Sequence, residues 1–301
     1  MHAGSPTAPD DLFALLGNET RVAILEALWD RFDIEAYMLA DQDPVPFSDL
    51  RAAADVDDVG NFNYHLGQLE GSLIEAHDEG YVLSPYGYNV LHALEGHTSF
   101  QYWTIEPTRL PDPCPFCDGV LEGSYEREIV SVTCRDCAAH GGGSLNRVRV
   151  PVSDGEPADL EEVLELSVLK LVSSFAAITY GRCPSCNHPA EVSLLSDDAG
   201  TGDSHQDVNC RVRCEACGSG GFGPAHEQAL ADPTVQAFFR DRGLGPADGL
   251  WAYRLAVLRS LSTHVEETDP VTVRYRFTLE EDACEIRLTE GPNGIRFAPV
   301  E

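Results

Sequence analysis

The sequence predicts an α+β chain, and three observations support this fold class. The first hundred residues contain several amphipathic helical runs and one short hairpin pattern. Eight of the ten cysteines fall into four Cys-x2-Cys pairs, a spacing typical of small metal-bound hairpins. The last part of the chain contains segments that alternate between apolar and polar residues, as the strands of an antiparallel meander do.

The N-terminal part contains several helical runs separated by turn residues. Apolar residues recur at helical spacing in each run, and Gly17-Asn18 separates the first run from the second. Ser48 and Ser84 stand where an N-cap residue is expected, and Pro85 follows at the first position of its helix. The predicted helices cover residues 12–16, 20–28, 47–54, 59–69 and a run that begins at residue 85.

A predicted hairpin over residues 73–83 lies between the last two helices. The order of three helices, a turn, a helix, a two-stranded wing and a final helix predicts a winged helix-turn-helix domain over residues 10–105. In that fold the second helix of the turn enters the major groove of double-stranded DNA.

Two segments of this domain resemble a known family. Residues 13–21 read Phe-Ala-Leu-Leu-Gly-Asn-Glu-Thr-Arg and resemble the opening of ArsR-like regulators of archaea. Residues 62–69 read Phe-Asn-Tyr-His-Leu-Gly-Gln-Leu and resemble the recognition helix of the same regulators. The cysteine-rich region downstream resembles haloarchaeal proteins that append zinc ribbons to such a domain. The resemblance implies a DNA-binding transcriptional regulator, and we expect it to act as a homodimer.

Polar side chains of the second helix of the turn are the expected DNA contacts, because amide side chains pair with adenine and Tyr or His can reach phosphate. The candidates on this helix are Asn61, Asn63, Tyr64, His65 and Gln68, and Arg51 on the preceding helix is a candidate phosphate contact. The alternative is a merely solvated helix face. Residues 1–100 hold three arginines, no lysine and 18 acidic residues, a formal charge of −15, so any DNA binding must rely on fit more than on attraction to phosphate.

The cysteine pairs form two quartets, with 16 and 27 residues between the pairs of each quartet. Their members are Cys114, Cys117, Cys134 and Cys137, and Cys183, Cys186, Cys214 and Cys217. Both segments resemble zinc ribbons. A site with four cysteines is closed, which favours two structural Zn2+ ions, with iron or a redox dithiol as alternatives. Cys210 is an alternative ligand or a buried side chain, and Cys284 is expected in the core.

The remaining segments predict a long helix and a C-terminal α+β part. Residues 158–180 form a helix that joins the two ribbons and could pack across a dimer. Residues 225–242 read as helical, and residues 250–261 are ambiguous between helix and strand. Strands are expected at 271–277, 283–288 and 295–300, with Arg274, Arg276 and Arg287 either solvated or forming an anion-binding face. After the first domain, the chain therefore divides into a first ribbon (106–150), a connecting helix (151–180), a second ribbon (181–224) and a C-terminal domain (225–301).

The charge balance is strongly acidic. The chain has 50 acidic and 20 basic residues, a net charge of −30, and Lys170 is its only lysine. This excludes a generic cationic binder of nucleic acid or membranes. The composition resembles that of halophilic archaea, where about 1 M salt shortens the Debye length to about 3 Å. A moderately acidic cytosolic protein is the alternative.

Motifs for other function classes are missing from the sequence. Residues 1–9 have no signal-peptide pattern, and the longest apolar stretch, residues 160–178, carries charged residues, so we expect a cytoplasmic protein without a membrane partner. No phosphate loop, nucleophile elbow or acid–base constellation is evident, so we expect no enzyme activity. Two other hypotheses remain: an adaptor whose winged helix no longer contacts DNA, and a thiol redox sensor that loses zinc on oxidation.

Overall fold

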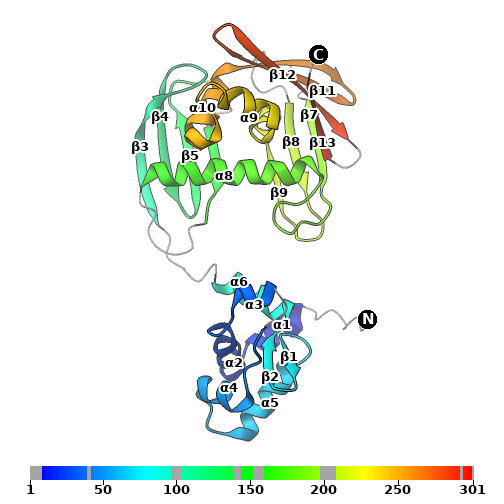
Figure 1. Ribbon diagram of the computed structural model, residues 1–301. Coiled ribbons are helices and arrows are strands. Elements are labelled where there is room, and N and C mark those ends of the chain that lie inside the picture. Colours follow the sequence, from blue (N-terminus) through cyan, green and yellow to red (C-terminus); the bar gives the residue numbers. More distant parts are fainter. Residues whose placement is uncertain are drawn as a thin grey trace. The chain divides into compact units, whose positions relative to one another are not determined.

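The chain divides into two compact units, residues 1–100 and residues 101–301. The structure is a computed structural model that describes residues 9–38, 42–95, 103–137, 144–151, 159–196, 208–291 and 294–299. It combines helices with antiparallel sheets, which confirms the predicted α+β class (Figure 1). Within the described ranges, no helix is both long enough and apolar enough to cross a membrane.

The first unit consists, in its described part, of helices and a short antiparallel hairpin. A core of apolar residues from α2, α4, α5 and the hairpin holds it together, and Ile24, Leu50 and Phe62 are completely buried. The elements are α1 (Pro9–Leu16), α2 (Glu19–Trp29), α3 (Ile34–Met38), α4 (Phe47–Ala53), α5 (Val59–Leu69), β1 (Ile74–His77), β2 (Gly80–Leu83) and α6 (Pro85–Glu95).

Of the two N-cap residues predicted for this unit, Ser84 and Ser48, the structure confirms only Ser84. The Ser84 hydroxyl accepts a hydrogen bond from a backbone N–H of α6, as expected, and the Asp58 carboxylate caps α5 in the same way. The predicted cap at Ser48 is wrong. Helix α4 already begins at Phe47, Pro46 takes the N-cap position, and the Ser48 hydroxyl donates to a neighbouring carboxylate instead.

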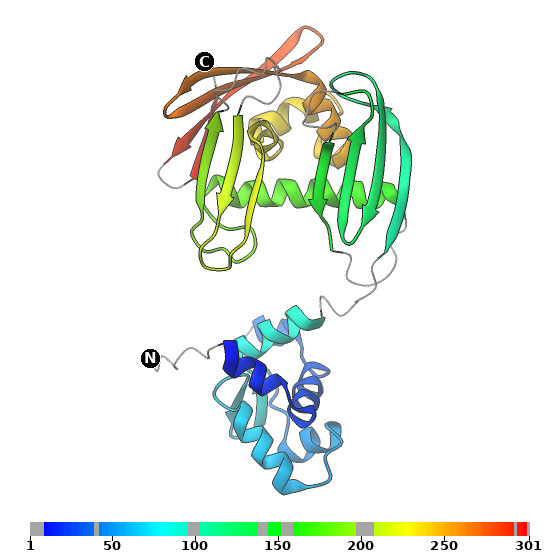
Figure 2. The same cartoon turned by 180° about the vertical axis from the view of Figure 1, so that it is seen from behind.

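The second unit contains antiparallel sheets, and a long helix runs across one side of two of them (Figures 1 and 2). The first sheet is β3 (Thr104–Pro113), β4 (Val120–Glu126), β5 (Ile129–Cys134) and β6 (Ser144–Arg149). The second is β7 (Glu191–Ser196), β8 (Val208–Arg213) and β9 (Gly220–Pro224). The third is β10 (Leu261–Thr268), β11 (Val271–Leu279), β12 (Asp282–Gly291) and β13 (Gly294–Pro299). The helices are α8 (Leu160–Thr179), η1 (Ala225–Ala231), α9 (Pro233–Arg240), η2 (Pro246–Asp248) and α10 (Leu250–Ser260).

Several elements of this unit differ from the sequence prediction. The predicted helix over 225–242 is split into η1 and α9 because Asp232 caps a new helix that starts at Pro233. The ambiguous segment 250–261 is helical, and it leads directly into β10, a strand that the pattern did not predict. Strand β3 was also missed. It contains three prolines and pairs irregularly at the edge of its sheet, where proline is tolerated.

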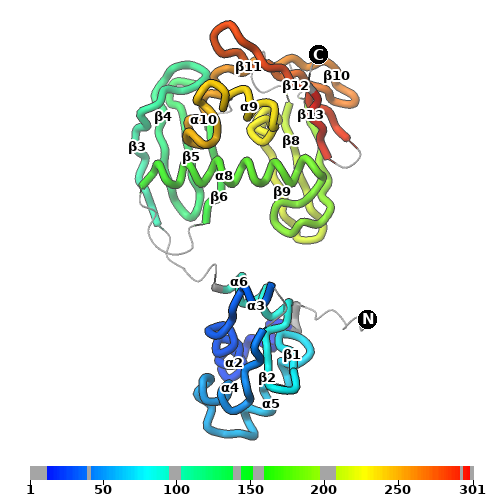
Figure 3. The backbone as a smooth tube through the Cα atoms, in the orientation of Figure 1, coloured from blue at the N-terminus to red at the C-terminus, as the bar shows by residue number. Residues whose placement is uncertain are grey.

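Helix α8 belongs to two hydrophobic cores at once. Val163 and Val168 in its first half pack into the core of the β3–β6 sheet. Phe175 and Ile178 in its second half pack into the core formed with β8, η1 and the C-terminal sheet. Figure 3 shows the helix running past both sheets. The apolar face predicted to join the ribbons is therefore buried within the chain itself.

The carboxylate of Glu165, on α8, fixes the start of α10. It accepts hydrogen bonds from the backbone N–H groups of Leu250 at 2.7 Å and Trp251 at 3.0 Å. Gly249, the N-cap residue, has no side chain to do this. A negative charge at a helix N-terminus also interacts favourably with the helix dipole.

We predict that Glu165→Ala lowers the free energy of unfolding of the second unit by about 1–2 kcal/mol, because two N–H groups of α10 lose their acceptor. Denaturant unfolding followed by tryptophan fluorescence measures this. Glu161→Ala is the matched control, since Glu161 is exposed on the same helix and should change stability little. Equal effects of the two substitutions would contradict the capping role.

Candidate functional site

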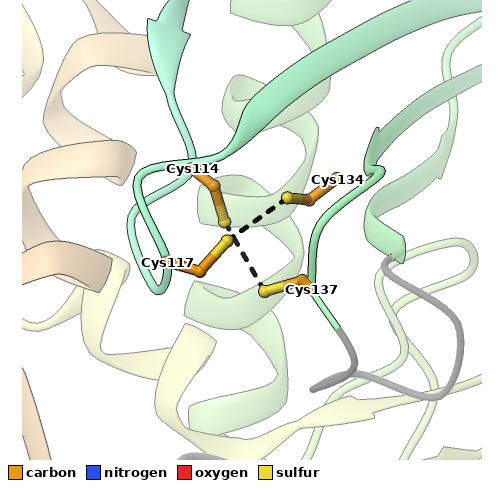
Figure 4. A group of neighbouring side chains, drawn as sticks. All are labelled: Cys114, Cys117, Cys134 and Cys137. Atoms are coloured by element: carbon orange, nitrogen blue, oxygen red, sulfur yellow. Dashed lines mark hydrogen bonds between the residues drawn. The ribbon is translucent and has the colours of Figure 1, made fainter.

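The eight paired cysteines form two separate clusters, in each of which the four sulfur atoms lie within 4.8 Å of one another. In the first cluster the Cys114 and Cys137 sulfurs are 3.8 Å apart, and those of Cys117 and Cys134 are 3.5 Å apart (Figure 4). The corresponding distances in the second cluster are 3.7 Å and 3.6 Å. A tetrahedral ion with metal–sulfur bonds of about 2.3 Å requires sulfurs about 3.8 Å apart, so both clusters are placed for metal binding.

The same backbone turn shapes three of the four pairs. The N–H of the first cysteine donates to the carbonyl five residues later, and the N–H of the residue just after the second cysteine donates back to the first cysteine's carbonyl. The donor–acceptor pairs are Cys114–Gly119 and Asp118–Cys114, Cys183–His188 and Asn187–Cys183, and Cys214–Ser219 and Gly218–Cys214, at 2.8–3.0 Å. This turn brings both thiols of a pair to one side.

The residue just after each of these pairs has a positive φ: 57° at Asp118, 59° at Asn187 and 72° at Gly218. Asp, Asn and Gly are the residues that adopt this left-handed conformation most readily. These three positions were missed by the sequence reasoning. The signal for them was present, since an Asp, Asn or Gly directly follows the second cysteine of each pair.

Antiparallel strands bring the two cysteine pairs of each cluster together. In the first ribbon, β4 begins just after the first cysteine pair and β5 ends at the second pair, so that Leu121 lies opposite Cys134. The second ribbon repeats this arrangement with β7 and β8. The Asp136 carboxylate also accepts the N–H of Val120 at 3.1 Å, which links the two turns of the first cluster.

The cysteines differ in exposure and in acidity. Burial, with the neighbouring thiols, raises the pKa of the Cys137 thiol. Hydrogen bonds from the side chain and backbone of Ser219 lower the pKa of exposed Cys217 to about 6. Since the thiolate is the metal ligand, this lowered pKa favours the metal-binding form of Cys217.

The two unpaired cysteines lie outside the clusters. Cys210 is buried in β8 within the hydrophobic core, where burial and the charge of Glu290 raise its pKa to about 12. Cys284 is buried in β12, as expected. Of the histidines near the pairs, His188 contributes its backbone carbonyl to a turn, and His140 lies outside the described residues.

The arginines of the C-terminal sheet are engaged in ion pairs. The Glu266 carboxylate, at a bulge in β10, accepts hydrogen bonds from Arg274 and Arg287, which lower its pKa to about 2. Arg276 pairs with Glu285. These guanidinium groups are neutralised by carboxylates of their own sheet, which does not favour an anion-binding face there.

Helix α5 has one buried and one exposed face. Phe62, Leu66 and Leu69 are buried in the core of the first unit. Of the candidate DNA contacts, Asn61, Asn63, Tyr64 and Gln68 are exposed, and the Tyr64 side chain is 61% exposed.

The other two candidates, His65 and Arg51, are engaged within the fold. The Nδ1 atom of half-buried His65 lies 3.3 Å from a guanidinium nitrogen of Arg21, and burial together with this charge lowers the pKa of His65. Arg21 also donates to carbonyls at the end of α1. Arg51 donates to the Asp57 carbonyl at 3.0 Å. The structure thus brings four of the six side chains to one exposed face.

We predict that Gly218→Ala destabilises the second ribbon by about 1–2 kcal/mol and weakens metal retention by its cluster. The cost is purely conformational, because an added Cβ would meet no atom within 4 Å but would have to adopt φ +72°. Competition with a metal chelator and thermal unfolding measure the two effects. Gly221→Ala is the control, since Gly221 also has open space around it but no positive φ. No difference between the variants would contradict the role of the turn.

Comparison with known proteins finds matches to family descriptions only. Residues 9–94 match a family described as "Domain of unknown function (DUF7347)". Residues 111–293, more than half of the chain, match one described as "Domain of unknown function (DUF7351)". No curated protein and no solved structure matches the chain. The chain belongs to the DUF7351 family.

Proposed function

We propose that the chain is a DNA-binding transcriptional regulator of the ArsR-like winged-helix type, with α5 as its recognition helix. The observation that carries this proposal is the exposed polar face of α5, where amide and phenol groups stand on a helix anchored by three buried apolar side chains. Amide side chains on such a helix can read adenine in the major groove.

The order of elements supports the same proposal. Helix α4 ends at Ala53, a short turn with Asp55 at φ 53° follows, and Asp58 caps α5. The hairpin β1–β2 comes directly after α5, as a wing would. In Figures 1 and 2, α5 lies at the end of this unit away from α6.

The charge of the first unit shapes how it would bind DNA. Helix α5 carries no lysine or arginine. Arg21, Arg31 and Arg51 all donate to backbone carbonyls of their own unit. Attraction to phosphate would therefore contribute little, and base-edge hydrogen bonds would supply most of the affinity. Molar salt, as in a halophilic archaeon, would screen the repulsion between this acidic unit and the phosphates.

We propose a homodimer in the cytoplasm as the active form. Ile34 and Met38 on α3 and Tyr86 and Leu94 on α6 are large apolar side chains that stay exposed. Helices α3 and α6 adjoin, since Tyr37 and Tyr88 stack with ring centroids 5.1 Å apart. An exposed apolar set of this kind suits a self-association surface.

We further propose that both cysteine clusters hold structural Zn2+ and that the chain is not an enzyme. Four cysteines close the coordination sphere and leave no open position for a substrate. The ions would fix each pair of turns to its sheet, so the metal contributes to folding.

The DNA-binding proposal predicts that Gln68→Ala weakens a sequence-selective complex by about 5- to 150-fold, the effect of losing one specific base-edge contact. Tyr64→Ala, which loses a phosphate contact, should weaken binding to all DNA sequences alike. A gel shift against genomic fragments in multimolar KCl measures this, and the complex should contain two chains. Glu26→Ala is the control, since Glu26 is exposed on α2. The logarithm of affinity should fall little with the logarithm of salt concentration.

A protein-interaction adaptor is the second candidate, and the charge of −15 together with the engaged arginines favours it. No selective complex at any salt concentration would reject the DNA proposal. Recovery of a stoichiometric protein partner whose binding depends on Tyr64 and Gln68 would then support the adaptor.

The zinc proposal predicts two equivalents of Zn2+ per chain by elemental analysis and one equivalent after Cys134→Ser. Cys210→Ala is the matched control and should retain both ions, because Cys210 lies outside the clusters. Iron in the native protein, or no metal, would contradict the assignment. Release of zinc by mild peroxide, with recovery by a thiol, would favour the redox sensor.

A further inference from the structure

A cavity of about 620 Å3 lies in the second unit. Its lining comes from β6, from β8 and β9, from one side of α8, and from η1 and α10. We propose that this cavity binds a small amphipathic organic anion, with a carboxylate head and an apolar body. The proposal does not depend on DNA binding by the first unit.

The charge of the cavity is opposite to that of the chain. The chain has 50 acidic and 20 basic residues, yet the charged residues lining the cavity are Lys170, Arg147, Arg254 and a single acid, Glu227. Lys170 is the only lysine in the sequence. These four side chains sum to +2 in a protein of net charge −30. Since Arg254 is paired with Glu227, the excess comes from Lys170 and Arg147, which are exposed, and it favours an anionic ligand.

Polar atoms in the cavity wall also lack hydrogen-bond partners. Asn146, Gln228 and Arg254 are 4%, 3% and 1% exposed. Within the part of the chain that the structure describes, the Asn146 Oδ1, Gln228 Oε1 and Arg254 Nη1 atoms have no partner. Buried polar groups are nearly always paired in native proteins, because an unpaired one costs free energy. These atoms are themselves buried, so the carboxylate of a ligand would meet the exposed Lys170 and Arg147 side chains of the lining instead.

The orientation of Arg254 is fixed by its other contacts. Its Nε and Nη2 atoms donate to the Glu227 carboxylate at 3.1 Å and 2.5 Å, and Nη2 also donates to the Leu145 carbonyl at 2.8 Å. The guanidinium is thus held in place and its charge is compensated by Glu227, so Arg254 shapes the wall of the cavity and adds no net charge to it.

The rest of the lining suits an apolar body. Leu171, Phe175 and Ile178 from α8 and Val148 from β6 contribute apolar surface. Phe222 of β9 also lines the cavity and is 67% exposed. The volume lies within the range of about 300–1,000 Å3 that is typical of small-molecule sites.

Three matched probes test the proposal by isothermal titration of the full-length, metal-loaded protein without DNA. Indole-3-acetate has the carboxylate and an N–H donor, 1-methylindole-3-acetate lacks the donor, and tryptophol replaces the carboxylate by an alcohol. We expect saturable binding of indole-3-acetate with one site per chain, at least about tenfold tighter than tryptophol. The methylated probe should bind about as tightly as indole-3-acetate, because the proposal requires no hydrogen-bond donor on the ligand.

Variants locate the site. Lys170→Gln should weaken indole-3-acetate about three- to tenfold, and Ser174→Trp, which fills the cavity from α8, should abolish binding. Arg211→Gln is the control: Arg211 is exposed on β8 outside the lining, so its loss of charge should not change affinity. Circular dichroism and two bound zinc ions would verify that each variant is folded.

Three results would overturn the proposal: no saturable binding of either carboxylate, equal affinity for tryptophol and indole-3-acetate, or unchanged binding in folded Ser174→Trp. None of these bears on the gel shift of the first unit, so the two proposals fail separately.

Discussion

Burial of α8 along its whole length is the interaction on which the second unit depends. Each ribbon sheet is small and would expose an apolar face without a partner. Val163 and Val168 cover one sheet, and Phe175 and Ile178 cover the other. Each buried aliphatic or aromatic side chain of this kind contributes about 1.5–3 kcal/mol, so one helix stabilises two modules that would be marginal alone. The same helix lies beside both cysteine clusters: Cys114 and Cys134 share the core of Val163 and Val168, and Cys183 lies near Ser174.

The same helix organises the polar interior. Glu165 caps α10. Arg254, on α10, donates hydrogen bonds to the Glu227 carboxylate and to the carbonyl of Leu145 in β6. A buried pair of this kind is costly to form and is retained where position matters. Here it places a guanidinium in the wall of a cavity that also includes Cys183 of the second cluster. Metal binding and the cavity are therefore neighbours in the structure.

The first unit faces a different constraint. It is strongly acidic, and its arginines already stabilise its own helices. If the proposed DNA binding holds, a helix that presents amide and phenol groups without a cation would gain its specificity from hydrogen bonds and shape. High salt would screen most of the repulsion that otherwise opposes contact with DNA.

Features of this protein that depend on neighbouring residues could be predicted from the sequence alone. The eight ligand cysteines, the helices α2, α5 and α8 and the hairpin depend on short-range spacing and turn residues, and the pattern predicted them. The conformation after three of the four cysteine pairs was also encoded locally, by Asp118, Asn187 and Gly218. Tertiary structure alone decided what depends on distant contacts. It determined that α8 serves two cores, that Pro-rich β3 pairs as an edge strand, that Glu266 neutralises Arg274 and Arg287, and that Lys170 lines the same cavity as Arg254. Spacing along the chain does not specify these, because each requires residues far apart in sequence to meet in three dimensions.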